Sequence, residues 1–272
     1  MATCYRHPTR ETGVACSNCS RPICPDCMTP TPVGMRCPEC SREKTKVVRG
    51  PVGGGLSTTT LSATVVLIAI NVILFVGEMA SGGSIGEAGG TLFQKLALFG
   101  PSIEFNHEYY RMVSYAFLHS GFLHIAFNMW FIWVIGNMLE PALGKVRFVA
   151  LYFASLLCGA FAVLLLEPNS ATVGASGAAF GLLGCAIVEA RSRGIDVWAT
   201  GLLPIALINF AFTFLFPGIS IGGHVGGFAG GLLVGLIFQQ ADRARLPRFA
   251  GTIGAVIVAV AAVVGGIAVV GG

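Results

Sequence analysis

The chain has 272 residues, of which 54% are hydrophobic and only 11% are charged, and its mean hydropathy is +0.76. Soluble domains carry about 25% charged residues, so this composition excludes a soluble secreted protein and predicts that most of the chain lies in a bilayer. The net charge of +4 is too small to indicate a nucleic-acid partner.

Residues 1–49 differ from the rest of the chain because they are polar and rich in Cys and Pro. Seven of the nine cysteines fall within the first 40 residues in close pairs, a pattern typical of metal ligands in a reducing compartment. No apolar run opens the chain, so we expect no cleavable signal peptide. The Gly-rich residues 50–60 are expected to form a flexible linker.

The head contains four pairs of ligand residues, each separated by two other residues. The pairs are Cys4 and His7, Cys16 and Cys19, Cys24 and Cys27, and Cys37 and Cys40. Two such pairs complete one tetrahedral zinc site, so four pairs predict two structural zinc ions with no open position for catalysis. Metal binding would supply most of the folding free energy of so small a segment. Free thiols and disulfides are the alternatives.

This head resembles B-box zinc fingers, in which the ligand pairs interleave. The resemblance implies that Cys4, His7, Cys24 and Cys27 bind one ion and that Cys16, Cys19, Cys37 and Cys40 bind the other. B-boxes commonly end with histidines, whereas this segment ends with Cys37 and Cys40. The head is expected to be a folding module that can dock a cytosolic protein.

The remainder of the chain contains seven apolar stretches close to the length of a membrane span. They are residues 61–79, 112–139, 146–166, 176–191, 197–216, 222–240 and 249–270. Residues 80–111 are too polar to cross a bilayer and are expected to lie in its interface. The sequence thus predicts an all-α polytopic membrane protein of seven transmembrane helices.

Basic residues indicate the orientation of these spans. With the N-terminal head in the cytoplasm, 15 of the 17 Lys and Arg residues lie inside, and only Lys95 and Arg111 lie outside. Since cytoplasmic loops are enriched in basic residues, we expect a cytoplasmic N-terminus and an extracytoplasmic C-terminus.

Polar side chains inside a bilayer are costly and are therefore functional candidates. The second span contains His119, His124 and Asn128, the fourth begins with Ser176, and the sixth contains His224. The small residues on either side of Ser176 would expose its hydroxyl at a helix start, where backbone N–H groups can face an anion. An α/β-hydrolase is disfavoured, because Ala178 replaces the second glycine of its nucleophile motif and no strand is predicted before Ser176.

Glycines on two spans predict close packing between Ser176 and His224. Gly227 and Gly231 share a helix face with His224, and the fourth span offers a matching set of glycines after Ser176. Such packing would bring the imidazole beside the hydroxyl, which is the minimum for nucleophilic catalysis. No carboxylate has a spacing that places it beside His224, so a dyad is favoured over a triad.

In the second span His124 and Asn128 stand four residues apart on one helix face. Both side chains can donate hydrogen bonds to a developing oxyanion. A pair that ties helices together is the structural alternative.

Residues 56–272 resemble the rhomboid intramembrane serine proteases. The resemblance rests on Tyr110-Arg111, on His119, His124 and Asn128, on Leu139-Glu140, on the Gly174–Gly177 segment, and on His224 with Gly227 and Gly231. It implies that Ser176 is the nucleophile and His224 the base. It also implies that His124, Asn128 and the Ser176 N–H surround the oxyanion. The family motif usually has Trp where Tyr110 stands, and Phe180 replaces a tyrosine that stacks on the histidine in some members.

The resemblance implies a six-helix protease core at 61–241, followed by a loop and an extra C-terminal helix at 242–272. We expect a serine endopeptidase that cleaves transmembrane segments of single-span or multi-span membrane proteins, in a plasma membrane of bacterial type and without a catalytic cofactor. The alternatives are a catalytically inactive relative that binds client helices and recruits a cytosolic partner, and a channel or transporter. A channel or transporter is disfavoured, because the sequence lacks paired intramembrane charges and obvious inverted repeats.

Overall fold

The computed structural model describes residues 2–31, 34–42, 61–86 and 89–272. The chain divides into two compact units, Met1–Thr59 and Thr60–Gly272. The linker predicted at 50–60 lies outside the described residues.

The first unit consists of very short elements. Strand β1 (Ala2–Thr3) pairs with β2 (Glu11–Thr12), and β3 (Thr29–Thr31) pairs with β4 (Gly34–Arg36), both antiparallel. The 3-10 helix η1 (Pro25–Cys27) and the helix α1 (Pro38–Arg42) complete the unit. Among its described residues, Ile23 is the one large aliphatic side chain that is buried, and it lies among cysteines. The described part of this unit therefore has no hydrophobic core that could hold it together alone.

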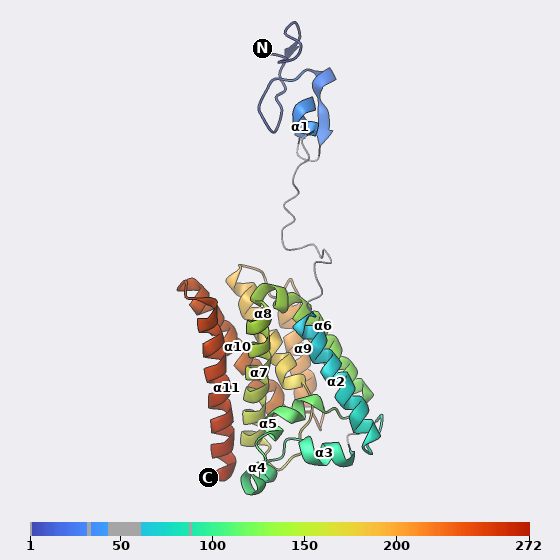
Figure 1. Ribbon diagram of the computed structural model, residues 1–272, viewed down its shortest axis with the longest axis vertical. Helices are drawn as coiled ribbons and strands as arrows, with labels where there is room; N and C mark the ends of the chain where they lie inside the picture. The colour runs from blue at the N-terminus through green and yellow to red at the C-terminus, as the bar shows by residue number, and fades with distance from the viewer. Residues whose placement is uncertain (1, 32–33, 43–60, 87–88) are drawn as a thin grey trace. The chain divides into compact units, whose positions relative to one another are not determined.

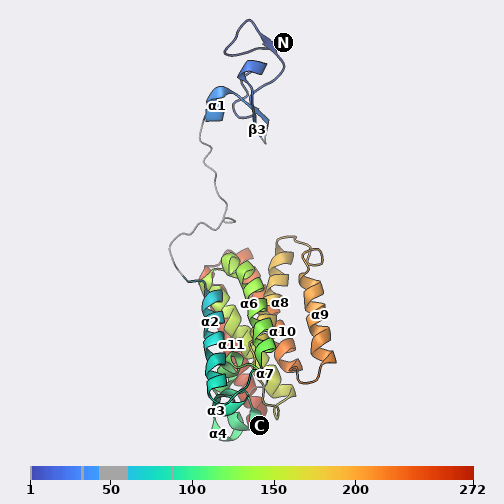
Figure 2. The same ribbon diagram turned by 90° about the vertical axis from the view of Figure 1, so that its right-hand side faces the viewer.

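The second unit is a helical bundle (Figures 1 and 2). Its helices are α2 (Ala63–Ala80), α3 (Gly90–Leu96), α4 (Gly100–Asn106), α5 (Arg111–Ser114), the 3-10 helix η2 (Tyr115–Phe117), α6 (Phe122–Leu143), α7 (Lys145–Leu166), α8 (Ser176–Ser192), α9 (Leu202–Leu215), α10 (Ile221–Arg243) and α11 (Arg248–Gly271). The long helices alternate in direction, so α6, α8 and α10 all begin at the end of the bundle where α3, α4 and α5 lie.

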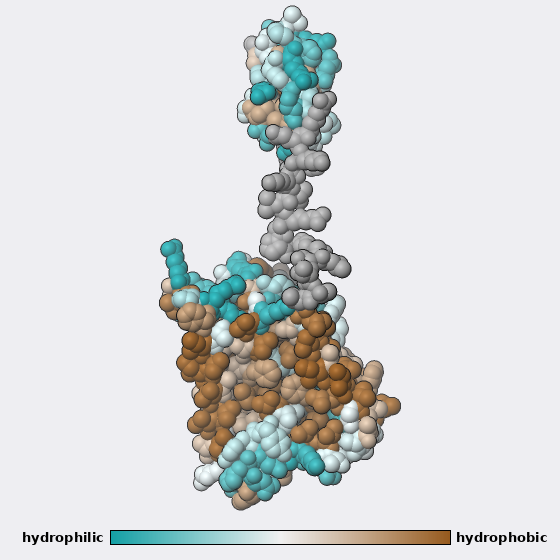
Figure 3. All heavy atoms as spheres, in the orientation of Figure 1, coloured by the Kyte–Doolittle hydropathy of each residue, from teal (hydrophilic) through white to brown (hydrophobic). Residues whose placement is uncertain are grey.

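The apolar surface of this unit forms a belt with hydrophilic side chains at both of its ends (Figure 3). In the described residues, five helices (α2, α6, α7, α10 and α11) are long and apolar enough to cross a membrane. Helix α8 has 17 residues, and the apolar helix α9 has only 14. Each of the seven predicted stretches overlaps one of these seven helices, which confirms the helical membrane fold.

The second predicted span is shorter than expected. Helix α6 begins at Phe122 instead of residue 112, because the chain is extended at Leu118 and turns at Gly121 with a φ of 99°. A positive φ favours glycine, and here a side chain on Gly121 would also collide with the backbone of Gly86. His119 thus lies before α6, whereas we predicted it inside the span. His124 becomes the third residue of the helix, at the same end of the bundle as the start of α8.

Arg111 fixes the segment between α2 and α6. Its guanidinium donates to the carbonyl oxygens of Ala97 at 2.8 Å and Gln94 at 2.9 Å, and to the carboxylate of Glu108 at 2.5 Å. The Tyr110 hydroxyl donates to a further carbonyl at the end of α3. The last carbonyls of a helix have no partners within the helix, so these two side chains satisfy groups that would otherwise be unpaired.

The same segment holds the chain that leads into α8. Leu98 and Thr172 exchange two backbone hydrogen bonds of 3.0 and 2.9 Å, and the Gly100 N–H donates to the Pro168 carbonyl at 2.8 Å. The approach to Ser176 is therefore attached to the anchored segment and is not a free loop.

At the end of the bundle away from α3, α4 and α5, two buried charged side chains link pairs of helices. The Glu140 carboxylate accepts hydrogen bonds from Ser62 and Thr64 and so caps the start of α2. Arg147 forms two hydrogen bonds of 2.9 and 2.8 Å with the Asp242 carboxylate, which links α7 to the end of α10. Helix α10 extends past residue 241, and the domain boundary predicted there stays a prediction.

Helices α8 and α10 approach each other so closely that their backbones touch. A Cβ atom on Gly231 would lie 1.9 Å from the Gly181 carbonyl oxygen, and one on Gly227 would lie 2.0 Å from that of Gly177. No side chain fits at these positions, as the glycine spacing predicts.

This contact makes Gly231→Ala a test of the packing. Because the methyl group collides with backbone, we expect the free energy of unfolding to fall by about 3 kcal/mol or more. The change is measured as a lower unfolding midpoint in detergent. Gly271→Ala is the control, since nothing lies within 4 Å of a Cβ atom at that helical glycine. Equal midpoints for the two variants would contradict the close contact.

Candidate functional site

Ser176 is the first residue of α8, and a turn that favours glycine precedes it. Gly174 has a φ of 126°, and its N–H donates to the Tyr115 carbonyl at 3.0 Å. This turn leaves Ser176 half-buried at the helix start, where the N–H groups of the first turn have no partners within the helix.

His224 is the fourth residue of α10, whose start is capped twice. The Ser220 hydroxyl accepts from the Gly223 N–H at 3.0 Å. The Glu167 carboxylate accepts from the Ser220 hydroxyl and from the N–H groups of Ile221 and Gly222. These bonds fix the backbone that carries the imidazole.

The Phe180 ring stacks on one face of the His224 ring. The two rings are stacked with centroids 4.1 Å apart and an interplanar angle of 18°. Phenylalanine therefore provides the stacking that the resemblance attributes to tyrosine in some relatives. Phe210 of α9 packs edge-on against Phe180 at 5.2 Å.

The glycine contact brings the backbones beside Ser176 and His224 together. A Cβ atom on Gly177 would lie 3.2 Å from the carbonyl oxygen of Gly223. Gly177 follows Ser176 directly, and Gly223 directly precedes His224. Within the described chain, no hydrogen bond is formed between the Ser176 hydroxyl and the His224 ring.

Thr213 on α9 is a neighbour of His224 that the sequence reasoning missed. Its buried Oγ1 lies 2.7 Å from His224 Nδ1 and donates to the Asn209 carbonyl at 2.8 Å. A threonine in an apolar helix has no distinctive sequence signal. Only the polarity of Thr213 among bulky apolar neighbours could have drawn attention to it.

His124 lies on the other side of the turn at Gly174. A Cβ atom on Gly174 would lie 2.8 Å from His124 Nε2 and 3.8 Å from Ser176 Oγ. His124 Nδ1 is 3.2 Å from the N–H of Ser120 and 2.8 Å from its hydroxyl. Because a backbone N–H can only donate, Nδ1 is the acceptor and Nε2 carries the proton. His124 therefore presents an N–H donor toward Gly174.

Asn128 and His119 occupy different settings. The Asn128 amide donates to the backbone carbonyl of His124 at 3.0 Å, one turn earlier on α6. His119 is fully buried, and its ring lies edge-on to that of His124 at 5.2 Å. Its backbone N–H donates to the Glu78 carboxylate. Neither ring nitrogen of His119 has a hydrogen-bond partner in the described chain.

The predicted metal ligands form two groups in the head. One contains Cys4, His7, Cys24 and Cys27, and the other contains Cys16, Cys19, Cys37 and Cys40. In each group the ligand atoms lie within 4.8 Å of one another. This is the interleaved arrangement that the resemblance to B-boxes implies.

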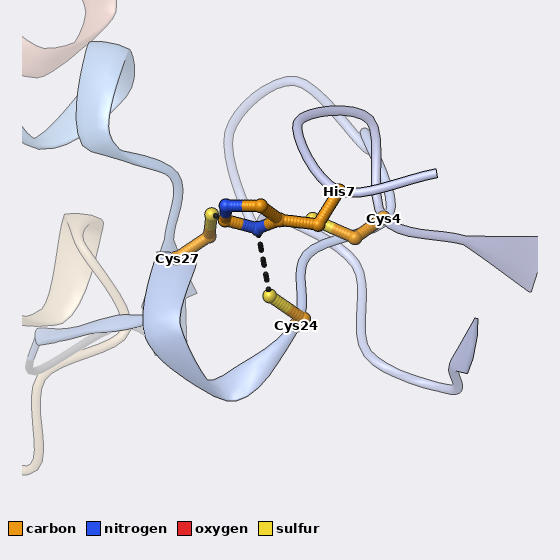
Figure 4. A group of neighbouring side chains, drawn as sticks. All are labelled: Cys4, His7, Cys24 and Cys27. Carbon is orange, nitrogen blue, oxygen red and sulfur yellow. Dashed lines mark hydrogen bonds between the residues drawn. The ribbon is translucent and has the colours of Figure 1, made fainter. Parts of the chain in front are cut away.

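In the first group the side chains converge from separate turns (Figure 4). His7 Nδ1 lies 3.3 Å from Cys24 Sγ, 3.5 Å from Cys27 Sγ and 3.9 Å from Cys4 Sγ. A set of four thiolate and imidazole ligands suits a metal ion that prefers sulfur ligands and tetrahedral coordination. The residues therefore fit a structural metal ion.

A polar contact joins the two groups. The Tyr5 hydroxyl, between ligands of the first group, donates to the carboxylate of Glu39, between ligands of the second. This hydrogen bond lowers the pKa of Glu39 to about 2. Arg6 forms an ion pair of 2.7 Å with the same carboxylate.

The Rhomboid domain model matches residues 106–241. The chain is 31% identical over 167 residues to rhomboid protease GluP of Bacillus subtilis, a match covering 59% of this chain and 32% of that protein. It is 33% identical over 141 residues to rhomboid-like protease 1 of Toxoplasma gondii, covering 49% of this chain and 48% of the relative. It is 27% identical over 129 residues to inactive RHOMBOID-like protein 8 of Arabidopsis thaliana, covering 47% and 36%.

The chain thus spans a third to a half of the length of these relatives, which include proteases and an inactive protein. The domain match covers half of this chain and includes α6, α7, α8, α9 and most of α10, with Ser176 and His224. The helical bundle and this match together show that the chain belongs to the rhomboid family.

Proposed function

We propose that this chain is an intramembrane serine protease with Ser176 as nucleophile and His224 as general base. The observation that carries the proposal is the backbone contact between Gly177 and Gly223, which are the direct neighbours of the two residues. A hydroxyl is a weak nucleophile unless a base accepts its proton, and an imidazole is the usual base.

The chemistry follows from these two groups. His224 Nε2 accepts the Ser176 proton while Oγ forms a bond to the carbonyl carbon of the substrate peptide. The tetrahedral intermediate collapses when the same proton passes from Nε2 to the leaving amine and the C–N bond breaks. A water molecule then hydrolyses the acyl-enzyme by the same route.

The surroundings of Ser176 supply donors for the negative oxygen of the intermediate. His124 points an N–H toward Gly174, and the first N–H groups of α8 carry the positive end of the helix dipole. Asn128 has a second amide hydrogen besides the one bound to the His124 carbonyl. We assign these groups to the oxyanion.

The substrate class follows from the depth of the site. Ser176, His224 and His124 all stand within the first turn of their helices, which begin at the end of the bundle where α3, α4 and α5 lie. A peptide bond can reach them where a client transmembrane helix ends or unwinds. Membrane proteins cleaved near one end of a transmembrane segment are thus the proposed substrates.

Ser176→Ala and His224→Ala test the dyad. Both variants should lose cleavage of a model single-span substrate by at least about 1,000-fold, because each removes a participant in every step. Reaction of the full chain with a fluorophosphonate reports the nucleophile directly and should require Ser176. Ser192→Ala, at the far end of α8, is the matched control and should react like the wild type.

Two results would reject the assignment. Undiminished cleavage in Ser176→Ala would show that another residue attacks the substrate. A folded wild type that neither cleaves nor reacts would favour the inactive alternative, a rhomboid relative that binds client helices.

For the head we propose that both ligand groups bind zinc. All eight ligands are Cys or His, and among the head's described residues they supply most of the buried interior. The ions would take the place of a hydrophobic core, and neither has an open coordination position for catalysis. A cytosolic protein is the proposed partner of this module.

Metal content tests whether the two groups bind separate ions. The purified full chain should contain two zinc ions per molecule by elemental analysis, and Cys27→Ser should lose one of them because it removes one ligand from a single group. Cys158→Ser, which removes a cysteine of α7, should retain both. Loss of both ions from Cys27→Ser would indicate that the two groups fold as one unit.

We infer that the protein lies in a bacterial-type plasma membrane with its head in the cytoplasm. The basic residues of the head and of the α6–α7, α8–α9 and α10–α11 connections all fall on one side under this orientation. An alkaline phosphatase fused after Gly272 should then be active, and one fused after residue 195 should be inactive. The reverse pattern would overturn the orientation.

A further inference from the structure

We propose that Thr213 is a positioning residue that holds His224 in the tautomer required of a base. The proposal rests on the proposed protease function. It addresses what replaces the missing carboxylate of a triad, since no acidic side chain bonds the His224 ring in the described chain.

The first observation is the geometry. Thr213 Oγ1 lies 2.7 Å from His224 Nδ1, which is a short hydrogen bond between α9 and α10. Thr213 is 2% exposed, while its neighbours on α9 Phe212 and Phe214 are 52% and 61% exposed. Thr213 therefore faces the interior at the point where the imidazole lies.

The direction of the bond follows from counting protons. The Thr213 hydroxyl has one proton, and two acceptors lie within reach, the Asn209 carbonyl at 2.8 Å and His224 Nδ1 at 2.7 Å. If the hydroxyl donates to Asn209, its oxygen can accept from an Nδ1–H, and both contacts are hydrogen bonds. If it donates to Nδ1 instead, the contact with Asn209 is lost. The arrangement with two bonds is favoured, and it leaves Nε2 without a proton.

The two histidines of the site thus take opposite tautomers. Ser120 donates to Nδ1 of His124, so His124 carries its proton on Nε2 and is a donor. Thr213 accepts from Nδ1 of His224, so Nε2 of His224 is a free acceptor for the Ser176 proton. A donor is what an oxyanion needs, and an acceptor is what a nucleophile needs.

Phe180 makes this control effective. The stacked phenyl ring fixes the plane of the His224 imidazole but cannot distinguish its two nitrogens. The bond to Thr213 sets which nitrogen faces away from α9. It also strengthens when Nε2 takes up the serine proton, because the ring then becomes a cation.

Thr213→Val tests the proposal, since valine keeps the shape and removes the oxygen. We expect the turnover rate of a single-span substrate to fall about 10- to 100-fold with little change in KM. Thr213→Ser should restore most of the rate. Thr252→Val, the same exchange on α11, is the control and should match the wild type in rate and in unfolding midpoint.

Nitrogen-15 NMR of the histidine-labelled full chain in lipid gives a second readout. The His224 signals, identified by their absence in His224→Ala, should show a protonated Nδ1 and a bare Nε2 in the wild type. This measurement needs no substrate and stands even if Thr213→Val does not fold. A proton on Nε2 in the wild type would overturn the proposal.

The two levels of inference fail separately. A wild type that cleaves in a Ser176-dependent way, with Thr213→Val equally fast, would refute the role of Thr213 and leave the protease function intact. A wild type with the expected tautomer but no reaction at Ser176 would refute the protease function instead.

Discussion

The backbone contact between α8 and α10 is the constraint on which the candidate site depends. This contact places the start of α8, with Ser176, directly beside the first turn of α10, with His224. Here the Gly181 carbonyl and Gly231 occupy the space that side chains would fill. In a bilayer, where the hydrophobic effect does not drive helices together, such contacts are held by packing and are lost with a single added carbon atom.

The parts of the site that are not on α8 and α10 are secured by hydrogen bonds to backbone. Arg111 binds two carbonyl oxygens at the end of α3, and Leu98 and Thr172 pair just beyond them. The turn at Gly174 is thereby held between His124 and Ser176. Helix α9 contributes differently, since it lies at the edge of the bundle (Figure 2) and contacts the site through Thr213 and Phe210.

Sequence reasoning succeeded where a residue type is costly in its setting and failed where it is not. Eight Cys and His side chains in pairs predict two ligand groups, and the structure brings the same eight side chains into two groups of four. A histidine in an apolar helix is conspicuous, so His224 could be singled out. The start of α6 could not be predicted, because residues 112–121 are apolar enough to belong to the same helix. The hydrogen bonds of Arg111 and the turn at Gly121 separate these residues from α6. Thr213 escaped notice because a threonine can satisfy its own hydroxyl within a helix.

The ability of a threonine to satisfy its hydroxyl within its own helix also explains why this residue type suits the role proposed for Thr213. A carboxylate bonded to the His224 ring would be buried at the end of the apolar belt, where a charge that loses its partner is expensive. The Thr213 hydroxyl offers an acceptor to Nδ1 without carrying a charge, and its own proton is already bound to Asn209. A neutral acceptor stabilises the imidazolium less than a carboxylate does, so more of the positioning must come from Phe180 and the capped start of α10. The bilayer would thereby favour the proposed dyad, supported by a hydroxyl, over a triad completed by an acid.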